Sequence, residues 1–139
     1  MRWLLVTEDF PPGFTGGIAS WVHDLAAALH MEGEQVEVLA RKTPGCTGFD
    51  RSQPFEVKRM RGRSWGSWKH LWAWAGCRGK RPDIAVFSTW ELARRAAGSL
   101  RKKGCRIMVA AHGSDLTRAG LDAGSLARCG DCFWLPVSS

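Results

Sequence analysis

The pattern that most constrains the fold is a change of hydrophobic period within about the first forty residues. Residues 3 to 7, WLLVT, form a short continuous apolar run, which is typical of a strand buried on both faces of a parallel sheet. Residues 35 to 40, QVEVLA, alternate like a second strand. Between them the apolar positions recur at helical spacing from residue 18, and Gly33 is placed to end the helix; these positions are Ile18, Trp21, Val22, Leu25 and Leu29. Strand, helix and strand in this order predict a right-handed crossover between parallel strands.

Strand and helix patterns continue to alternate along the rest of the chain. The segment from 41 to 54 is rich in glycine and proline, so we expect a loop there. Gly104 is placed to end a helix. The patterns indicate strands at 55–60, 82–87, 106–111 and 133–137, and helices at 65–77, 91–103 and 121–128. They predict an α/β fold: a single Rossmann-like domain over residues 1–139, with a doubly wound, mostly parallel sheet.

Length and composition restrict the class of protein. With 139 residues, 45% of them hydrophobic, the chain can form one domain with its own core. No run approaches the roughly 20 apolar residues that a membrane span requires. Five cysteines at irregular spacing do not resemble a secreted disulfide framework, so we expect reduced thiols and a cytoplasmic protein. The formal charge of +7 favours anionic partners without choosing among nucleotide phosphates, anionic lipids and nucleic acids.

Two glycines stand between the first predicted strand and the first predicted helix. In an open parallel sheet, ligands collect beyond the carboxyl ends of the strands, and this is where Gly16 and Gly17 lie. Bare backbone lets amide groups approach an anion, and the start of the helix presents free N–H groups toward it. The pair therefore predicts contact with a phosphate or a sugar. The alternative is that these glycines serve only the turn, because neither the dinucleotide nor the P-loop fingerprint is met.

A second polar segment follows another predicted strand. Residues 110 to 115, AAHGSD, place His112 and Asp115 directly after a buried strand, hence at the same edge of the sheet as Gly16. An imidazole there could donate a hydrogen bond to a sugar hydroxyl or a phosphate oxygen, and Gly113 would leave room for a ligand. The alternative is a histidine that packs its own loop. Two such features at one edge favour a ligand site.

The cysteine pair near the end of the chain does not indicate a metal centre. Cys129 and Cys132 form a lone CxxC, whereas a zinc site normally needs four ligands. Cys105 and His112 could complete a set only if the fold brought them close. A redox CxxC usually begins a helix after a strand, and this pair precedes a strand. We therefore predict no metal site.

These segments together resemble a known family. The segments LLVTEDFPPGFTGGIASWVHDLAAAL, GEQVEVLA, PDIAVFSTW, AAHGSD and LPVSS occur in the order seen in the N-terminal half of family 4 retaining glycosyltransferases. The resemblance covers nearly the whole chain. The chain is similar in particular to the phosphatidylinositol mannosyltransferase and lipopolysaccharide glycosyltransferase branches of this family. The resemblance implies one Rossmann-like half of a GT-B fold and a hexosyltransferase-like activity. The substrates it implies are a nucleotide-diphosphate sugar as donor and a glycan or lipid-linked acceptor, with no separate cofactor.

The resemblance also implies roles for particular residues. Gly16 and Gly17 would border the donor diphosphate and the acceptor, and His112 would reach the transferred sugar as the catalytic residue, with Asp115 in the same loop. Two positions depart from the family pattern. Trp21 and Ser88 stand where many relatives have histidine, so acceptor contacts from these positions are not implied.

The family's nucleotide-sugar site lies mainly in a second Rossmann-like domain with an E-x(7)-E motif. We find no such motif in these residues and expect the C-terminal donor-binding domain to be absent from them. The chain would then supply the acceptor half alone, would need a donor-domain partner or its missing C-terminal half, and would be inactive by itself. A noncatalytic α/β module that binds a sugar or phosphate is the alternative.

A basic, tryptophan-rich segment spans residues 59 to 81, with seven Lys or Arg residues and no acidic one. On a helix its tryptophans share one side, as in an interfacial element that binds anionic lipid; the candidate contacts are Arg61, Arg63, Trp65, Trp68, Lys69 and Trp72. Such binding would place the protein at the inner face of the membrane. The alternative is that the tryptophans pack on the sheet while the charges are solvated. Nucleic acid is a weaker prediction, because nothing else in the sequence matches a nucleic-acid-binding motif.

Overall fold

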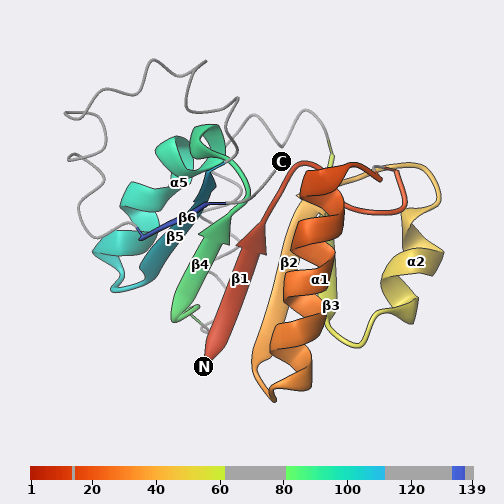
Figure 1. Ribbon diagram of the computed structural model, residues 1–139, viewed down its shortest axis with the longest axis horizontal. Coiled ribbons are helices and arrows are strands. Elements are labelled where there is room, and N and C mark those ends of the chain that lie inside the picture. Colours follow the sequence, from red (N-terminus) through yellow and green to blue (C-terminus); the bar gives the residue numbers. More distant parts are fainter. Residues whose placement is uncertain (14, 62–80, 112–132, 137–139) are drawn as a thin grey trace.

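Six parallel strands form one sheet in the order β3-β2-β1-β4-β5-β6 (Figure 1). The computed structural model describes residues 1–13, 15–61, 81–111 and 133–136. The strands are β1 (Arg2–Val6), β2 (Gln35–Arg41), β3 (Glu56–Met60), β4 (Ile84–Phe87), β5 (Arg106–Ala111) and β6 (Phe133–Pro136). The helices are α1 (Gly17–Met31), α2 (Cys46–Ser52) and α5 (Trp90–Lys102). This strand order is that of a doubly wound Rossmann-like sheet, as the sequence predicts.

The two long helices end where the sequence predicts, for a backbone reason. Gly33 follows α1 with a φ of +84°, and Gly104 follows α5 with a φ of +80°. In each case this glycine and the residue after it donate backbone hydrogen bonds to carbonyls of the last helical turn: at α1, Gly33 donates to His30 and Glu34 to Leu29. These bonds form a Schellman motif, whose left-handed residue is usually glycine because glycine has no Cβ to clash.

The expectation that residues 41 to 54 form a loop is wrong in part, because α2 lies inside this segment. Gly45 precedes the helix in a left-handed conformation, with a φ of +75°. After the helix, the side-chain amide of Gln53 donates to the Phe49 carbonyl at 3.2 Å. Asp50 is further held by Arg59 of β3, at 2.8 Å. Local propensity alone predicts a loop, and contacts with a neighbouring strand stabilise one short helix.

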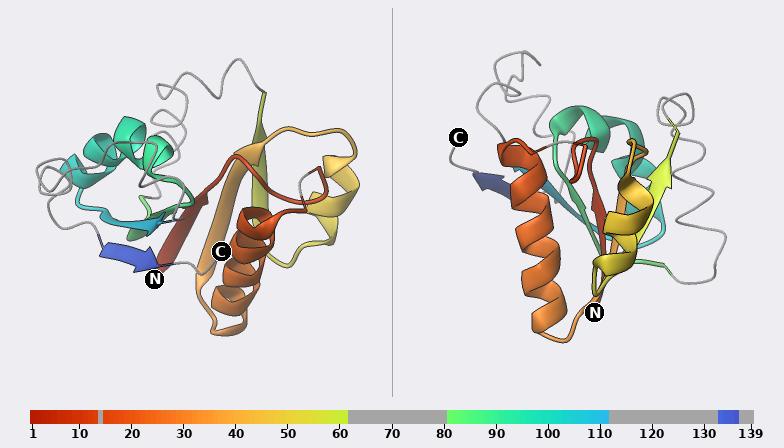
Figure 2. Two further views of the ribbon diagram at one scale, coloured as in Figure 1. Left: turned by 45° about the horizontal axis from the view of Figure 1, so that its top comes forward. Right: turned by 90° about the vertical axis from the view of Figure 1, so that its right-hand side faces the viewer.

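The sheet buries an apolar cluster on each face, and the helices α1 and α5 lie on opposite faces of the sheet (Figure 2). Side chains alternate along β1, so Leu4 and Val6 join the cluster under α5 and Leu5 joins the cluster under α1. The cluster under α5 contains Phe87 from the neighbouring β4, which is fully buried. Burial on both faces explains the continuous apolar runs of the central strands. The predicted helices at 65–77 and 121–128 lie outside the described residues.

Candidate functional site at the carboxyl edge of the sheet

The central strands β1 and β4 are neighbours, although their connections lead to opposite halves of the sheet. The ladder continues just past both strands, since Thr7 N donates to Leu39 O and Ser88 N donates to Val6 O, each at 3.0 Å. The chain then leaves β1 toward one side and β4 toward the other. In open α/β sheets, ligands bind beyond the carboxyl ends of the strands at such a switch point.

Gly16 and Gly17 lie at this edge, at the start of α1. Gly16 caps the helix with φ −73° and ψ 179°, an extended backbone that any residue adopts. No described atom lies within 4 Å of where a Cβ would stand on either glycine. Neither backbone conformation nor packing against the described residues therefore requires glycine here. The open space is compatible with close approach of a ligand to the backbone.

The starts of α1 and α5 differ in how their first N–H groups are satisfied. At α5 the hydroxyl of Thr89 accepts a hydrogen bond from Leu92 N at 3.4 Å, and Glu91 adds an acidic side chain in the first turn. At α1 no side chain caps the first turn, and that turn has no acidic residue. The positive end of the α1 dipole thus faces the carboxyl edge without a compensating charge in that turn.

The loop between β1 and α1 packs tightly against its surroundings. Thr7 is fully buried, and its hydroxyl donates to the Asp9 carbonyl at 2.9 Å. Phe10 is also fully buried, with its ring centroid 6.0 Å from that of His23 on α1. Gly13 lies so close to the loop after β2 that a Cβ on it would stand 2.5 Å from the Thr43 Cβ. These contacts fix the path of the chain toward Gly16.

Charged groups gather around the same loop. A terminal nitrogen of Arg41 lies 3.4 Å from a carboxylate oxygen of Glu8. The pKa of Asp9 is raised because partial burial disfavours its charged form and the charge of Glu8 adds to this, while Arg41 opposes both effects. At the end of β4, the Ser88 hydroxyl is buried and has no hydrogen-bond partner among the described residues. This edge therefore offers carboxylates and a buried hydroxyl in addition to the uncapped start of α1.

The two predicted glycines occupy the predicted edge, while the other predicted site residues cannot be placed. His112 and Asp115 lie outside the described residues. The strand that leads to them, β5, is parallel to β4 and ends at Ala111, so its carboxyl end belongs to the same edge as that of β1. The proximity of His112 to Gly17 stays a prediction.

Sequence reasoning missed Asp9, which follows β1, and Arg41, which ends β2, and it gave no role to Ser88, which follows β4. Their position directly after apolar strand runs was the available signal. It indicates the edge of the sheet, but it does not indicate which side chains become buried.

The basic segment is only partly described. Arg61 is exposed directly after β3, whereas Arg63, Trp65, Trp68, Lys69 and Trp72 lie outside the described residues. Arg59, which begins the basic run, is only 6% exposed and pairs with Asp50. It is therefore not available to a membrane surface, and the charge that the run could offer to lipid is smaller by one. Within the described part of the chain, no helix is long and apolar enough to cross a membrane.

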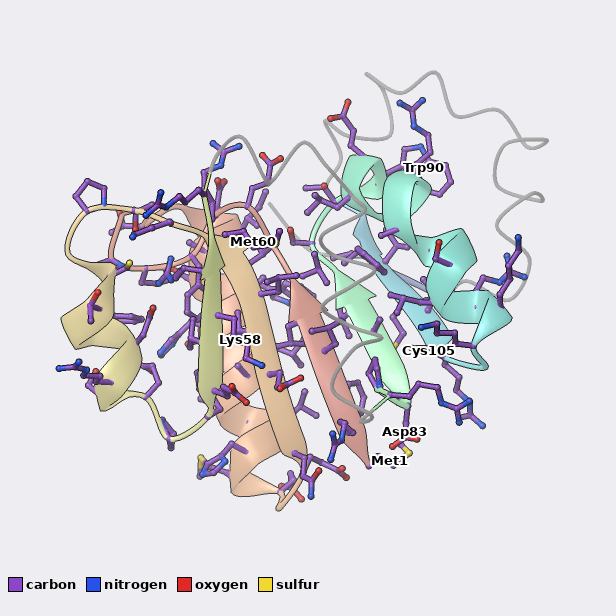
Figure 3. The ribbon with its side chains drawn as sticks, turned by 180° about the vertical axis from the view of Figure 1, so that it is seen from behind. Met1, Lys58, Met60, Asp83, Trp90 and Cys105 are labelled. Carbon is purple, nitrogen blue, oxygen red and sulfur yellow. The ribbon has the colours of Figure 1, made fainter. Side chains whose placement is uncertain are left out.

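Two cysteines belong to the described residues. Cys46 and Cys105 are free and buried, and Cys105 lies near the amino end of β5 (Figure 3). Cys129 and Cys132 lie outside the described residues. The described ranges contain no group of three or more His, Cys, Asp or Glu side chains that could hold a metal ion.

Comparisons with known proteins agree with this geometry. Residues 15–129 match the family model of Glycosyltransferase Family 4. Two solved structures are similar: the catalytic domain of starch synthase IV from Arabidopsis thaliana, bound to ADP and acarbose, and MurG from Acinetobacter baumannii. The first has a TM-score of 0.58 at 17% identity over 90% of this chain, and the second 0.61 at 15% over 99%. No curated protein gives a significant match.

The chain spans less than half of either structure, 38% of the starch synthase chain and 44% of the MurG chain. At these identities the likeness concerns the fold alone. It identifies the parallel sheet as one Rossmann-like half of a GT-B fold.

Proposed function

The chain belongs to glycosyltransferase family 4, and from this premise we propose that it forms the acceptor-binding half of a sugar-transferring enzyme. The donor is a nucleotide-diphosphate sugar, and the acceptor is a glycan or a lipid-linked molecule. One observation supports this most directly: the uncapped start of α1, with open space at Gly16 and Gly17, lies at the switch point of the sheet. The ADP bound in the similar starch synthase structure agrees with a nucleotide donor.

The residues of this chain would act mainly by binding and orientation. Transfer of a sugar from a nucleotide diphosphate places negative charge on the departing phosphates. The first N–H groups of α1 and its dipole stabilise such charge when the phosphates approach Gly16 and Gly17. We assign His112 to the transferred sugar and Asp115 to the same loop, from the family resemblance. Glu8 and Asp9 supply carboxylates that accept hydrogen bonds from acceptor hydroxyls.

A transfer assay tests this function. The chain would be assayed with UDP-, ADP- and GDP-sugars, first alone and then with a separately expressed donor domain of a family 4 enzyme. We expect no transfer by the chain alone and transfer when the donor domain is added. Robust transfer by the chain alone would contradict the assignment to an acceptor half. Sugar or phosphate binding that never leads to transfer would favour the alternative, a noncatalytic binding module.

Paired glycine substitutions locate the site. Gly17→Val places a branched side chain where phosphates would approach, and we expect kcat/KM, measured with the donor domain present, to fall by up to about 100-fold. Gly48→Val is the matched control, because Gly48 is also helical and no described atom lies within 4 Å of where its Cβ would stand. The control should retain full activity. Equal activity of the two variants would refute the role of Gly17.

We also propose that the basic segment attaches the protein to anionic membranes through Arg61 and the residues that follow it. Each basic residue near such a surface contributes about 1 kcal/mol. Cosedimentation with phosphatidylglycerol and phosphatidylcholine vesicles tests this, with the triple variant Arg61→Glu, Arg63→Glu and Lys69→Glu as control. Equal binding to both vesicle types, or unchanged binding of the variant, would contradict membrane attachment. Salt-dependent binding to single-stranded DNA instead would favour a nucleic-acid partner.

A further inference from the structure

The guanidinium of Arg59 joins four parts of the fold. Arg59 belongs to β3, and its Nε and one Nη form a fork on the Asp50 carboxylate of α2, at 3.0 and 2.8 Å. The other Nη donates to the carbonyl of Arg41 at the end of β2, at 3.0 Å. The Nη that binds the Asp50 carboxylate also donates to the carbonyl of Pro11 in the β1–α1 loop, at 2.5 Å. One planar group thus ties this loop to two strands and a helix.

The same loop is held by the face of the guanidinium as well as by its edge. The central carbon of the Arg59 guanidinium lies 5.3 Å from the centroid of the Phe10 ring, in cation–π geometry. Phe10 in turn contacts His23 of α1 and Phe49 of α2, with centroids 6.0 and 6.1 Å apart. Arg59 therefore fixes two successive loop residues, Phe10 and Pro11, and the loop leads directly to Gly16.

Because this ion pair is buried, its role in positioning the loop differs from a contribution to overall stability. The side chains of Arg59 and Asp50 are only 6% and 15% exposed. Buried ion pairs recover little net stability, because their mutual attraction has to offset a large desolvation cost. A hydrophobic pair of similar volume has no hydrogen-bond donors for the carbonyls of Pro11 and Arg41. A lysine cannot supply the fork either, since its ammonium is a single point charge.

We propose that Arg59 is a positioning residue for the ligand edge. It holds the β1–α1 loop so that Gly16 and the start of α1 keep a fixed position relative to the carboxyl ends of the strands. As a role in sugar transfer this rests on the proposed function, but the mechanical role of Arg59 does not. The Ser20 amide reports the loop position, because it donates to the Gly16 carbonyl at 3.1 Å in the first helical turn. Release of the loop should weaken this bond first.

The test uses the full chain and the double variant Arg59→Met with Asp50→Leu, followed by residue-resolved amide hydrogen exchange. We expect the unfolding midpoint to stay close to that of the unsubstituted protein, as for other replaced buried pairs. Exchange at Ser20 should become about tenfold faster, the factor expected for one lost hydrogen bond to a charged group. The amide of Leu5 in the sheet should not change.

Lys58→Met with Glu37→Leu is the matched control. Lys58 adjoins Arg59 on β3, but it points to the opposite face of the sheet (Figure 3) and lies 3.5 Å from Glu37 on β2. This control should leave exchange at Ser20 unchanged. Arg59→Lys, which keeps the charge, serves as a second variant if the double replacement does not fold, and it should also accelerate exchange at Ser20.

The possible outcomes separate this inference from the proposed function. Unchanged exchange at Ser20 in both Arg59 variants, or equal acceleration in the Lys58 control, would overturn the positioning role whatever the enzyme does. Faster exchange at Ser20 together with a raised KM for a nucleotide sugar, measured with the donor domain present, would support both. Faster exchange at Ser20 in a protein that neither transfers sugar nor binds a sugar nucleotide would support the positioning role and contradict the proposed function.

Discussion

The close approach of Gly13 to Thr43 gives a sharp test of how the β1–α1 loop is held. A Cβ added at Gly13 would lie 2.5, 2.6 and 2.7 Å from the Cβ, Cγ2 and Oγ1 atoms of Thr43. Ordinary carbon–carbon contacts are about 3.5 to 4.0 Å, so Gly13→Ala requires a displacement of about 1 Å. The backbone fixes the Thr43 Cβ, so a change of rotamer moves Cγ2 and Oγ1 but leaves the 2.5 Å contact with Cβ.

We expect Gly13→Ala to lower the free energy of unfolding by about 1 to 3 kcal/mol, the range for overpacking a well-packed site. In a chain of this size each kcal/mol corresponds to roughly 3 °C in Tm. Urea denaturation followed by circular dichroism measures the difference. Gly16→Ala is the internal control, because it lies in the same loop with no described atom within 4 Å of the added Cβ, and it should change stability by less than about 0.5 kcal/mol.

A compensating substitution completes the test. Thr43→Gly removes all three clashing side-chain atoms, and the Thr43 hydroxyl has no hydrogen-bond partner among the described residues. The double variant with Gly13→Ala should therefore be more stable than the sum of the single changes by about 1 kcal/mol or more. Additive effects, or a Gly13→Ala variant as stable as Gly16→Ala, would show that this contact does not constrain the loop.

Three further predictions concern other parts of the molecule. Gly98→Ala in the exposed middle of α5 should raise the free energy of unfolding by about 1 kcal/mol. Gly104→Ala should lower it by about 1 to 2 kcal/mol, because Gly104 has a φ of +80°. Thermal denaturation of both variants measures these differences. The raised pKa of Asp9 means that its ionised carboxylate costs stability above its folded pKa, and this cost disappears as the carboxyl is protonated at lower pH. Asp9→Asn should thus stabilise the protein at about pH 7 but not at about pH 3, as measured by urea titration, and the opposite pH trend would contradict the prediction. Burial raises the pKa of Cys105 to about 11, so peptide mapping after thiol labelling at about pH 8 should find it unmodified in the native protein and modified in urea.

The parts of the fold that follow from local patterns could be predicted from the sequence. The apolar runs of β1, β4 and β5 indicate strands buried on both faces, and the sheet has them at its centre. Gly33 and Gly104 were predicted to end helices, and both adopt the left-handed conformation that ends α1 and α5. These features depend on single residues and short periods, which a sequence displays directly.

The parts that depend on distant contacts could not be predicted. The helix α2 contains Gly48 and follows Pro44, so its local sequence favours a loop; the bond from Arg59 to Asp50 that supports it joins separate elements. Arg59 itself belongs to a run of basic residues that is typical of a solvated or lipid-facing surface. Its burial became visible only when the fold placed a carboxylate and two carbonyl groups around it.

The candidate site divides in the same way. Topology predicted that Gly16 and Gly17 would lie at the carboxyl edge, since ligands in open α/β sheets bind there. The burial of the Ser88 hydroxyl and the raised pKa of Asp9 depend on side-chain packing around the switch point. Periodicity carries no information about such packing.

The strand order has an engineering consequence. Residues 2–60 contribute the three adjacent strands β3-β2-β1, and residues 84–136 contribute the adjacent strands β4-β5-β6, so the two halves of the sheet pair through β1 and β4. Opening the backbone between Met60 and Ile84 would give two fragments, each with its neighbouring strands in an unbroken stretch of sequence. Because the paired β1 and β4 lead to the candidate ligand edge, a molecule bound at that edge would favour reassembly by mass action. The protein is therefore suited to fragment complementation, in which recovery of the joined sheet reports that a ligand occupies this edge.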